Sequence, residues 1–411
     1  MDTEAVTTSS LDETRPLRKN RNFTLLWGGQ AISQLGTAVA VLAFPLLVLA
    51  MSGSAVQAGA LGTVQAVIRV AFQLPAGVFA DRWNRKRVMQ ICDAARAGLF
   101  LVLALAVLLD RAPLAAIFVI ASAAAVLDVL FSAAEKSIVS QLVPKEQLSE
   151  AFATNEARTY GASLAGPPLG GLLYGLGRSI PFLFDVLSYV LSFLAVSFIR
   201  KPVSPHEEEK SKTSMREDVM EGLRYVWGSP FLRAVIFLAA PINFALSAVQ
   251  FSIIMILTDA GHSSQVVGIT QGCIAVGGLI GAFLAARIQK LLPFHRLIII
   301  TLILLLVLLA GSALLSGEII MVLPVTLGLF LAPAVNSALF GKIATVTAER
   351  IQGRVISVVV LSAMAAASLA PIIAGLVVEM SGGVQAMGTA LVATAASLLA
   401  AIVCRRTLKT V

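Results

Sequence analysis

The residues of this sequence that could do chemistry are ionisable side chains inside long apolar stretches. The apolar segment 113–138 carries Asp128 and Glu135, which lie seven positions apart and therefore on one face of a helix. Ionisable groups at membrane depth are costly and are often functional, for example as proton relays. Asp128 lies deeper than Glu135, so we predict that it carries a proton; the alternative is a static ion pair with Arg69 or Arg158. Further candidates for proton coupling are Glu135, Glu156, Arg69 and Arg158.

A second charged pair lies in the apolar segment 88–109. Asp93 and Arg96 are three positions apart, a spacing that brings two side chains together on a helix. We expect a structural ion pair here, or support for the loop before it, rather than a substrate contact. Most ionisable residues at membrane depth, Asp185 among them, fall in the first half of the chain, so we expect proton coupling in that half.

Polar amide side chains also occur inside the apolar segments. A mostly apolar cavity with few polar groups suits a lipophilic ligand. Each amide taken alone is more often a hydrogen bond between helices, which is the alternative interpretation. The candidate cavity residues are Gln30, Gln34, Gln65, Asn243, Gln250 and Asn336.

Motifs of catalysis and of ATP hydrolysis are missing. The sequence contains neither an HExxH motif nor a Walker phosphate-binding loop. The histidines and cysteines are scattered without the spacing of a metal site: His206, His262, His295, Cys92, Cys273 and Cys404. We therefore expect no enzyme activity, no pump driven by ATP, no metal and no cofactor.

Long apolar segments must position these residues. Of the 411 residues, 57% are hydrophobic and 13% are charged, whereas a soluble domain has about 25% charged residues. The apolar runs are continuous, which favours helices over the short alternating strands of a barrel. The predicted fold class is an all-α membrane protein with about twelve transmembrane helices. The predicted spans are 23–50, 56–80, 88–109, 113–138, 151–176, 179–199, 231–258, 266–287, 296–316, 318–341, 352–378 and 383–403.

One long hydrophilic stretch divides the spans into two equal sets. The predicted organisation is an N-terminal tail (1–22), a six-helix bundle (23–199), a solvated linker (200–230), a second six-helix bundle (231–403) and a C-terminal tail (404–411). Two such bundles are typical of transporters that work by alternating access, with the substrate near the bilayer midplane.

Positive charge is distributed unevenly between the loops. The Lys and Arg residues cluster in alternate loops, and the other loops hold only Arg111 and Arg178. By the positive-inside rule, this pattern predicts an inner-membrane protein with both termini in the cytoplasm and an even number of spans. The first residues contain no apolar core, so we expect no cleaved signal. The net charge of +8 is explained by topology and does not suggest nucleic acid. We expect the lipid bilayer and a small lipophilic substrate as partners, and a monomer.

The loop from Gly77 to Arg87 reads Gly-Val-Phe-Ala-Asp-Arg-Trp-Asn-Arg-Lys-Arg. It resembles the GxxxDRxGRR/K signature of the major facilitator superfamily, with Asn84 where glycine is usual. Asn tolerates left-handed backbone geometry, so we expect the turn to survive. The resemblance implies a latch in which the acidic residue meets a helix N-terminus and stabilises one conformation. The residues of this predicted latch are Gly77, Asp81, Arg82, Arg85 and Lys86.

A glycine and proline motif lies in the segment 151–176. Gly166, Pro167, Gly170 and Gly171 are spaced for close helix contact. The segment 266–287 carries glycines at the same spacing, so we predict that the two helices pack against each other across the interface between the two halves. The motif is similar to the GPxxGG signature of proton-driven antiporters in the superfamily.

Further matches narrow the resemblance to the macrolide-efflux and enterobactin-exporter-like group. They are Leu142–Leu148, Phe182–Ser188, the Gln352-Gly353-Arg354 motif and Ala370–Gly375. Gly353 and Arg354 join the predicted helix-packing residues. The resemblance implies the superfamily fold and proton-coupled export of drugs or natural products. The alternatives are a facilitator or importer of a metabolite or lipid with the same fold, and a membrane receptor or enzyme.

Overall fold

The computed structural model describes residues 16–200 and 215–410; within these ranges a few side chains, including those of Asp81 and Arg82, lie outside the described part. All regular structure in these ranges is helical. The long helices of the first half are α1 (Arg21–Ser52), α2 (Ala55–Arg82), α3 (Arg85–Leu108), α4 (Leu114–Leu142), α5 (Leu148–Leu176) and α6 (Ile180–Ser197). Those of the second half are α8 (Pro230–Asp259), α9 (Ser264–Leu291), α10 (Phe294–Leu314), α11 (Val322–Leu329), α12 (Ala332–Val346), α13 (Glu349–Ser368), α14 (Ala370–Ser381) and α15 (Gly383–Val403). The short helices are η1 (Leu17–Lys19), η2 (Lys145–Gln147), α7 (Met215–Gly228), η3 (Ile319–Met321) and α16 (Arg405–Thr410).

The predicted all-α class is confirmed. Eleven segments of the described chain are long and apolar enough to cross a membrane. Helix α5 is as long as its neighbours but less apolar, because Glu150, Glu156 and Arg158 lie in its first half and glycine and proline residues occupy much of its second half. Such residues allow close packing and polar contacts inside a membrane protein, so α5 fits as a further span.

Two predicted spans are each built from two helices. The tenth breaks between α11 and α12, and the eleventh breaks between α13 and α14. Pro333 and Pro371 lie in the first turns of α12 and α14. Proline has no N–H to donate to the preceding turn, so it starts a new helix more easily than it continues one.

The predicted linker contains a helix that the sequence analysis missed. Helix α7 lies inside the segment expected to be solvated, while the charge run at 207–212 falls outside the described residues. Val226 of α7 is fully buried, and Glu221 forms ion pairs with Arg350 and Arg354 of α13. The predicted packing role of Arg354 is thus a contact with α7, and a Cβ on Gly222 would lie 3.1 Å from the Arg354 carbonyl oxygen.

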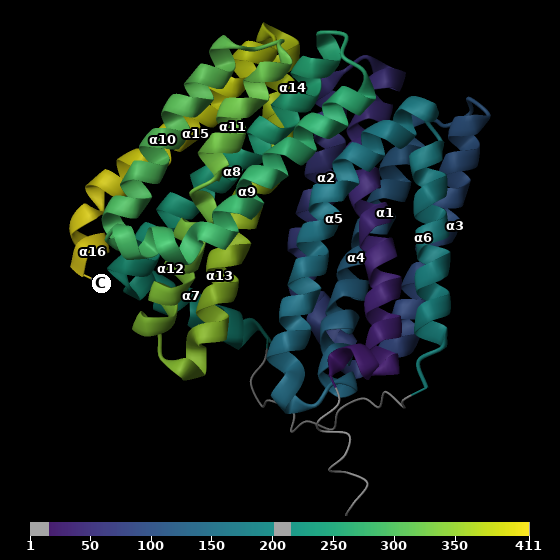
Figure 1. The fold of residues 1–411 in the computed structure, drawn as a ribbon, viewed down its shortest axis with the longest axis horizontal. Coiled ribbons are helices and arrows are strands. Elements are labelled where there is room, and N and C mark those ends of the chain that lie inside the picture. The colour runs from purple at the N-terminus through teal and green to yellow at the C-terminus, as the bar shows by residue number, and fades with distance from the viewer. Residues whose placement is uncertain (1–15, 201–214, 411) are drawn as a thin grey trace, which may run out of the picture. The chain divides into compact units, whose positions relative to one another are not determined.

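Contacts among the described residues divide the chain into two compact units. The first is drawn from Met1–Val41, Ala71–Gly166 and Leu176–Glu208, and the second from Leu42–Val70, Pro167–Gly175 and Glu209–Val411. In the first unit α3 packs against both α4 and α6, and α1 lies beside α6 (Figure 1). In the second, α8 packs against α13, α14 and α15. These units cut across the two predicted bundles, and the bundle division stays a prediction.

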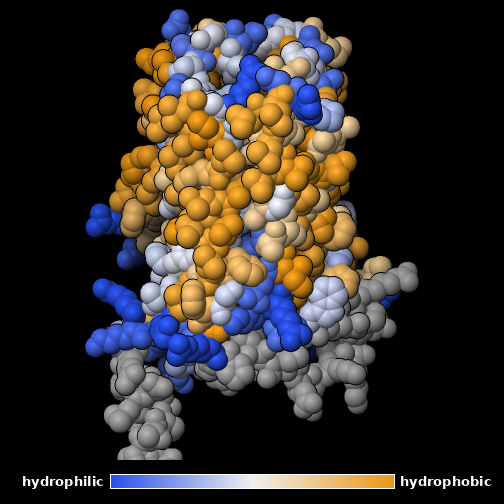
Figure 2. Space-filling view, turned by 90° about the vertical axis from the view of Figure 1, so that its right-hand side faces the viewer, coloured by the Kyte–Doolittle hydropathy of each residue, from blue (hydrophilic) through white to orange (hydrophobic). Residues whose placement is uncertain are grey.

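One face of the first unit carries the surface expected of a helix bundle in lipid. Large apolar side chains of α3 and α6 are exposed there, including Ile91, Val102, Leu108 and Leu187. Figure 2 shows a broad hydrophobic belt on this side of the molecule, with hydrophilic residues at both ends. Because so much exposed apolar surface is stable only against hydrocarbon, this face is a lipid-facing one.

Candidate functional site

The first unit contains a cavity whose wall combines polar and apolar side chains. Its volume is about 260 Å³. Helices α1, α3, α4 and α5 supply the wall, and the titratable residues on it are Arg96, Asp128 and Glu135. Both predicted cavity residues of α1 lie there, accompanied by hydroxyl side chains: Gln30, Gln34, Ser33, Thr37, Ser132, Thr159 and Ser163. This wall is more polar than the sequence led us to expect.

Arg96 is the central cation of the site. Its side chain is 2% exposed and bonds Asp93, which is fully buried, at 2.7 Å. The guanidinium carbon lies 4.6 Å from the centre of the Phe131 ring and 4.4 Å from that of Tyr189, within cation–π range. A second nitrogen reaches Asp128 at 3.4 Å, and the Asp128 side chain is 31% exposed. Asp93 is therefore the tight partner of Arg96, and Asp128 is a looser partner that faces the cavity.

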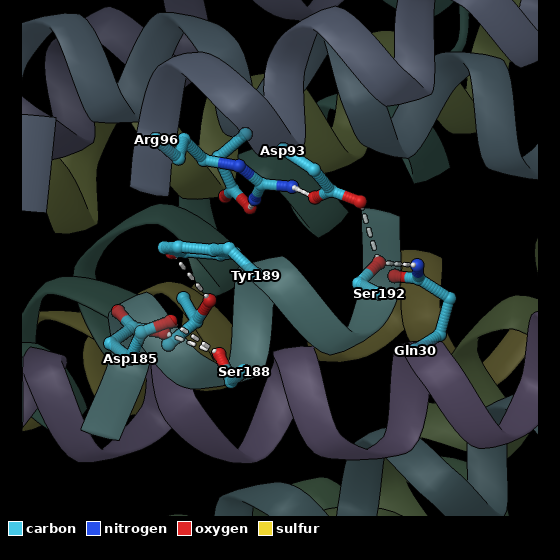
Figure 3. A network of polar contacts seen from close by, with 9 residues as sticks. Gln30, Asp93, Arg96, Asp185, Ser188, Tyr189 and Ser192 are labelled. Atoms are coloured by element: carbon cyan, nitrogen blue, oxygen red, sulfur yellow. Dashed lines mark hydrogen bonds and ion pairs between the residues drawn. The ribbon is translucent and has the colours of Figure 1, made fainter. Parts of the chain in front are cut away.

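Asp93 also belongs to a hydrogen-bond chain between α1, α6 and α3 (Figure 3). Ser192 of α6 donates to Asp93 at 2.6 Å, and Gln30 of α1 donates to the Ser192 hydroxyl at 2.8 Å. A buried carboxylate satisfied by a cation and a hydroxyl group is stable in the charged form. The predicted Asp93–Arg96 pair is confirmed. The hydrogen bonds through Ser192 and Gln30 link this pair on α3 to α6 and α1.

A second buried ion pair lies on the same cavity wall. Arg158 of α5 bonds Glu135 of α4 at 2.5 Å, and both side chains are largely buried. Arg158 and Thr159 also donate to the Gln34 side-chain oxygen, at 3.1 and 3.3 Å. Both acids of the wall thus bond a cation, but the Glu135 side chain is 9% exposed and the Asp128 side chain is 31% exposed.

Asp128 forms an ion pair with Arg96, and Arg158 pairs with Glu135. Of the two alternative partners that we considered for Asp128, Arg158 thus bonds Glu135, and the pair with Arg69 stays a prediction. Helix periodicity could place these groups on faces, but it could not decide which cation meets which acid.

The other candidate residues are distributed more widely. Glu156 is an exposed residue of α5. Asn243 donates to the Ala239 carbonyl of its own helix at 2.9 Å. The remaining cavity and coupling candidates fall in the second unit, where Gln250 and Asn336 are exposed and Gln65 and Arg69 are half-buried. Their predicted roles stay predictions.

The loop between α2 and α3 begins with a capped helix. Asn84 adopts φ −65° and ψ 108°, and its side chain accepts a hydrogen bond from the Arg87 N–H at 3.1 Å. The chain turns here as expected, but Asn84 does not use the left-handed geometry that it tolerates, because it serves as the N-cap of α3. Lys86 donates to the carbonyls of Ser197 and Ile199, at 2.9 and 2.7 Å, at the C-terminal end of α6. A cation there is favourable for the helix dipole.

The structure describes only some of the other predicted latch residues. Arg85 is buried and Gly77 is half-buried in α2, while the side chains of Asp81 and Arg82 lie outside the described part of the chain. The latch role of this loop therefore remains a prediction.

The predicted packing of α5 on α9 is confirmed in the second unit. A Cβ on Gly171 would overlap the Ser264 carbonyl and lie 3.0 Å from the Cα of Gly268. The Ser264 hydroxyl donates to the Gly171 carbonyl at 3.0 Å. The α9 glycines further along meet α11 instead, since Gly277 and Gly281 lie against Thr326 and Phe330. Gly166 packs on Ala38 of α1 in the first unit, and a Cβ on Gly268 would overlap the Pro167 carbonyl of α5. Gly170 is buried in α5.

Helices α2 and α14 cap each other in the second unit. Glu379 of α14 accepts hydrogen bonds from the Ser54 hydroxyl and the Val56 N–H at the start of α2, at 2.8 and 3.1 Å. In return, Thr63 of α2 accepts from the Ile372 N–H at the start of α14, at 3.1 Å. Each helix thus satisfies a backbone donor that the other leaves unbonded. The sequence analysis missed this pair because a cap from a distant helix leaves no local pattern.

The sequence analysis also missed a group of three polar residues on one face of α6. Asp185, Ser188 and Ser192 repeat at three, four and seven positions and therefore share one face of the helix. All three are buried, and they face α1 and α3. Their spacing was the available signal, but serines inside apolar helices are too common to single them out.

Comparison with known proteins agrees with this architecture. A family model described as Major Facilitator Superfamily matches residues 26–371. The chain is 30% identical over 228 residues to the uncharacterized MFS-type transporter YkuC of Bacillus subtilis, a match that covers 53% of each chain. It is 26% identical over 359 residues to the multidrug efflux pump Tap of Mycolicibacterium fortuitum, covering 84% of this chain and 87% of that protein. Macrolide efflux protein A of Streptococcus pyogenes is 22% identical over 264 residues, covering 64% and 65%.

Solved structures share the fold. A bacterial homologue of the human lysosomal transporter Spinster superposes with a TM-score of 0.73 at 14% identity, covering 94% of this chain and 98% of that one. A bacterial homologue of the iron transporter ferroportin gives 0.71 at 16% identity, with coverage of 94% and 98%. The chain therefore belongs to the Major Facilitator Superfamily and is a membrane transporter with the twelve-helix fold of that family, not an enzyme.

Proposed function

We propose that this protein exports drugs or lipophilic natural products from the cell by alternating access, driven by a proton gradient. The observation that carries the proposal is the position of Asp128, a partly exposed acid on the wall of a cavity, beside a buried arginine that has a second and tighter partner. The similarity to the efflux pump Tap and to macrolide efflux protein A supports the direction of transport.

The cavity wall suits an amphipathic ligand. Hydroxyl and amide groups of α1, α4 and α5 offer donors and acceptors, while Ala38, Val41, Phe131 and Ala162 offer apolar surface. A few polar groups in a partly apolar pocket fix the orientation of a ligand whose affinity comes mainly from apolar contact.

Asp128 is suited to exchange a proton without disturbing the fold. If a proton neutralises Asp128, its weak bond to Arg96 is lost, but Asp93 still compensates the arginine charge at 2.7 Å. The change is then confined to the cavity wall, where substrate binds. A proton and a substrate can thereby alter each other's affinity through a shared group, which is the requirement for coupled exchange.

Asp128→Asn should abolish uphill transport while leaving downhill exchange. The amide keeps the size of the side chain but cannot take up or release a proton, so coupling is lost. The measurement is uptake into inverted vesicles with an imposed pH gradient, over a panel of drugs and natural products, at matched protein levels. Asp110→Asn, in the exposed turn after α3, is the control and should transport normally.

If the Asp128→Asn variant still concentrates substrate against its gradient, Asp128 is structural. Glu135 and Glu156 would then be the next candidates. Transport by the wild type that ignores the pH gradient would instead favour a facilitator.

We further propose an inner-membrane location with both termini in the cytoplasm, on the basis of the loop charges. A reporter that is active only in the periplasm should be inactive when fused after Val411. The same reporter inserted at Arg111, in the turn between α3 and α4, should be active. Activity of the fusion after Val411 would reverse the assignment.

A further inference from the structure

Asp185 of α6 is a fully buried acid that forms no ion pair with a cation of the described chain. Its Oδ1 accepts a hydrogen bond from Ser188 at 2.9 Å, while its Oδ2 has no hydrogen-bond partner among the described residues. The Ser188 hydroxyl also lies 2.8 Å from the Asp185 carbonyl oxygen, so its one hydrogen is divided between two acceptors. Asp93, which is equally buried, has both a cation and a hydroxyl donor.

The nearby arginine of α3, Arg96, forms its ion pairs with acids other than Asp185. Arg96 bonds Asp93 and Asp128, and its guanidinium lies over one face of the Tyr189 ring. Figure 3 shows this ring between Arg96 and Asp185. Among the described residues of the first unit, Arg96 bonds Asp93 and Asp128, and Arg158 bonds Glu135. Asp185 is the buried acid in this part of the chain that has no such ion pair.

A charged carboxylate in this position would be strongly unfavourable. An uncompensated buried charge costs several kcal/mol, and burial without a full set of hydrogen bonds adds to that cost. The neutral acid avoids the charge, and its O–H group gives Oδ2 a donor in place of an unsatisfied acceptor.

Helix α1 covers the Asp185 carboxyl group. A Cβ on Gly36 would overlap Asp185 Oδ1 and the Ser188 hydroxyl, so only glycine lets the α1 backbone lie this close. The next residue, Thr37, lies within hydrogen-bond distance of the Tyr189 hydroxyl, at 3.1 Å. The facing groups on α1 are uncharged. Titratable groups near Asp185 come from α6 itself and from other helices: Tyr189 on α6, Asp93 and Arg96 on α3, and Asp128 on α4.

From this geometry we infer that Asp185 is a second proton-binding residue of the transporter, which holds a proton while α1 is packed against α6 at Gly36. When α1 moves away, the O–H bond breaks, the proton passes to entering water, and the carboxylate remains, now hydrated. This inference rests on the proposed function only for the use of the proton in transport; the protonation itself follows from the packing.

Infrared spectroscopy of the purified protein in lipid tests the protonation directly. At neutral pH the wild type should show the carbonyl stretch of a protonated carboxylic acid, and Asp185→Asn should lack it. Asp93→Asn is the matched control, because Asp93 is equally buried but charged, and it should keep the band. Spectra of wild type and Asp185→Asn that superpose in this region would overturn the inference. Ser188→Ala offers a milder second variant, which should shift the band by removing the bond to Oδ1.

Transport tests the use of that proton. Asp185→Asn should lose accumulation driven by a pH gradient and retain downhill exchange. Unchanged accumulation in a variant that lacks the band would show that the proton is structural and would overturn the coupling role. Failure of the proposed function has a different signature, since the wild type itself would then ignore the pH gradient while keeping the band.

Discussion

Arg96→Met is expected to lower the free energy of unfolding by about 3–5 kcal/mol, the usual loss when one partner of a buried ion pair is removed. The variant leaves Asp93 fully buried without its cation, and it removes the charge from between the Phe131 and Tyr189 rings. The hydrogen bond from Ser192 alone cannot compensate Asp93. The measurement is the thermal unfolding of the purified protein in lipid nanodiscs.

A double-mutant cycle separates this effect from simple loss of packing. Arg96→Met combined with Asp93→Leu removes both charges, and replacing a buried pair by apolar residues is often close to neutral. We therefore expect the double variant to recover most of the lost stability. Arg111→Met, in the exposed turn after α3, should change stability by less than about 0.5 kcal/mol. Equal losses in the single and double variants would contradict the ion-pair explanation.

Gly171→Leu is expected to abolish transport while leaving the protein in the membrane. The added side chain has no space, because the Ser264 carbonyl and the backbone of Gly268 occupy the position. Overpacking costs about 1–3 kcal/mol, and every 1.4 kcal/mol changes an equilibrium about tenfold. The conformation with α5 packed on α9 would then become rare, and a cycle that passes through it would stall. The measurement is the initial rate of transport in vesicles at equal protein levels.

Gly161→Leu is the matched control, because it makes the same change on the same helix. Gly161 is exposed, and a Cβ there meets no described atom within 4 Å. It should transport at close to the wild-type rate. A normal rate for Gly171→Leu would mean that the α5–α9 seam does not form part of the transport cycle.

The sequence alone determined the all-α class and the position of nearly every span. Twenty or so apolar residues can satisfy their backbone in lipid only as a helix, so a local run of residues is enough to define a span. The Asp93–Arg96 pair was equally local, since three positions along a helix bring the two side chains together. The α5–α9 seam was predictable because small residues at fixed spacing mark a close contact.

Elements with weaker local signals were predicted less well. Helix α7 was taken for part of the linker because its 14 residues include charged side chains and follow a hydrophilic stretch. Val226 and Glu221 nevertheless hold it against the rest of the second unit. The breaks before α12 and α14 were missed because a proline in an apolar run can either kink a helix or begin one. In each case the packing of neighbouring helices decided where a helix forms and where it begins.

Only the tertiary structure decided which acid meets which cation. Asp128 meets Arg96, Glu135 meets Arg158, and Asp185 meets none of the described cations, although all three acids are alike in the sequence. Periodicity fixes the face of a helix on which a side chain lies, but pairing depends on the rotation and depth of helices that are far apart in the chain. The reciprocal caps of α2 and α14 arise in the same way, because a helix end can be satisfied by any donor or acceptor that folding brings to it.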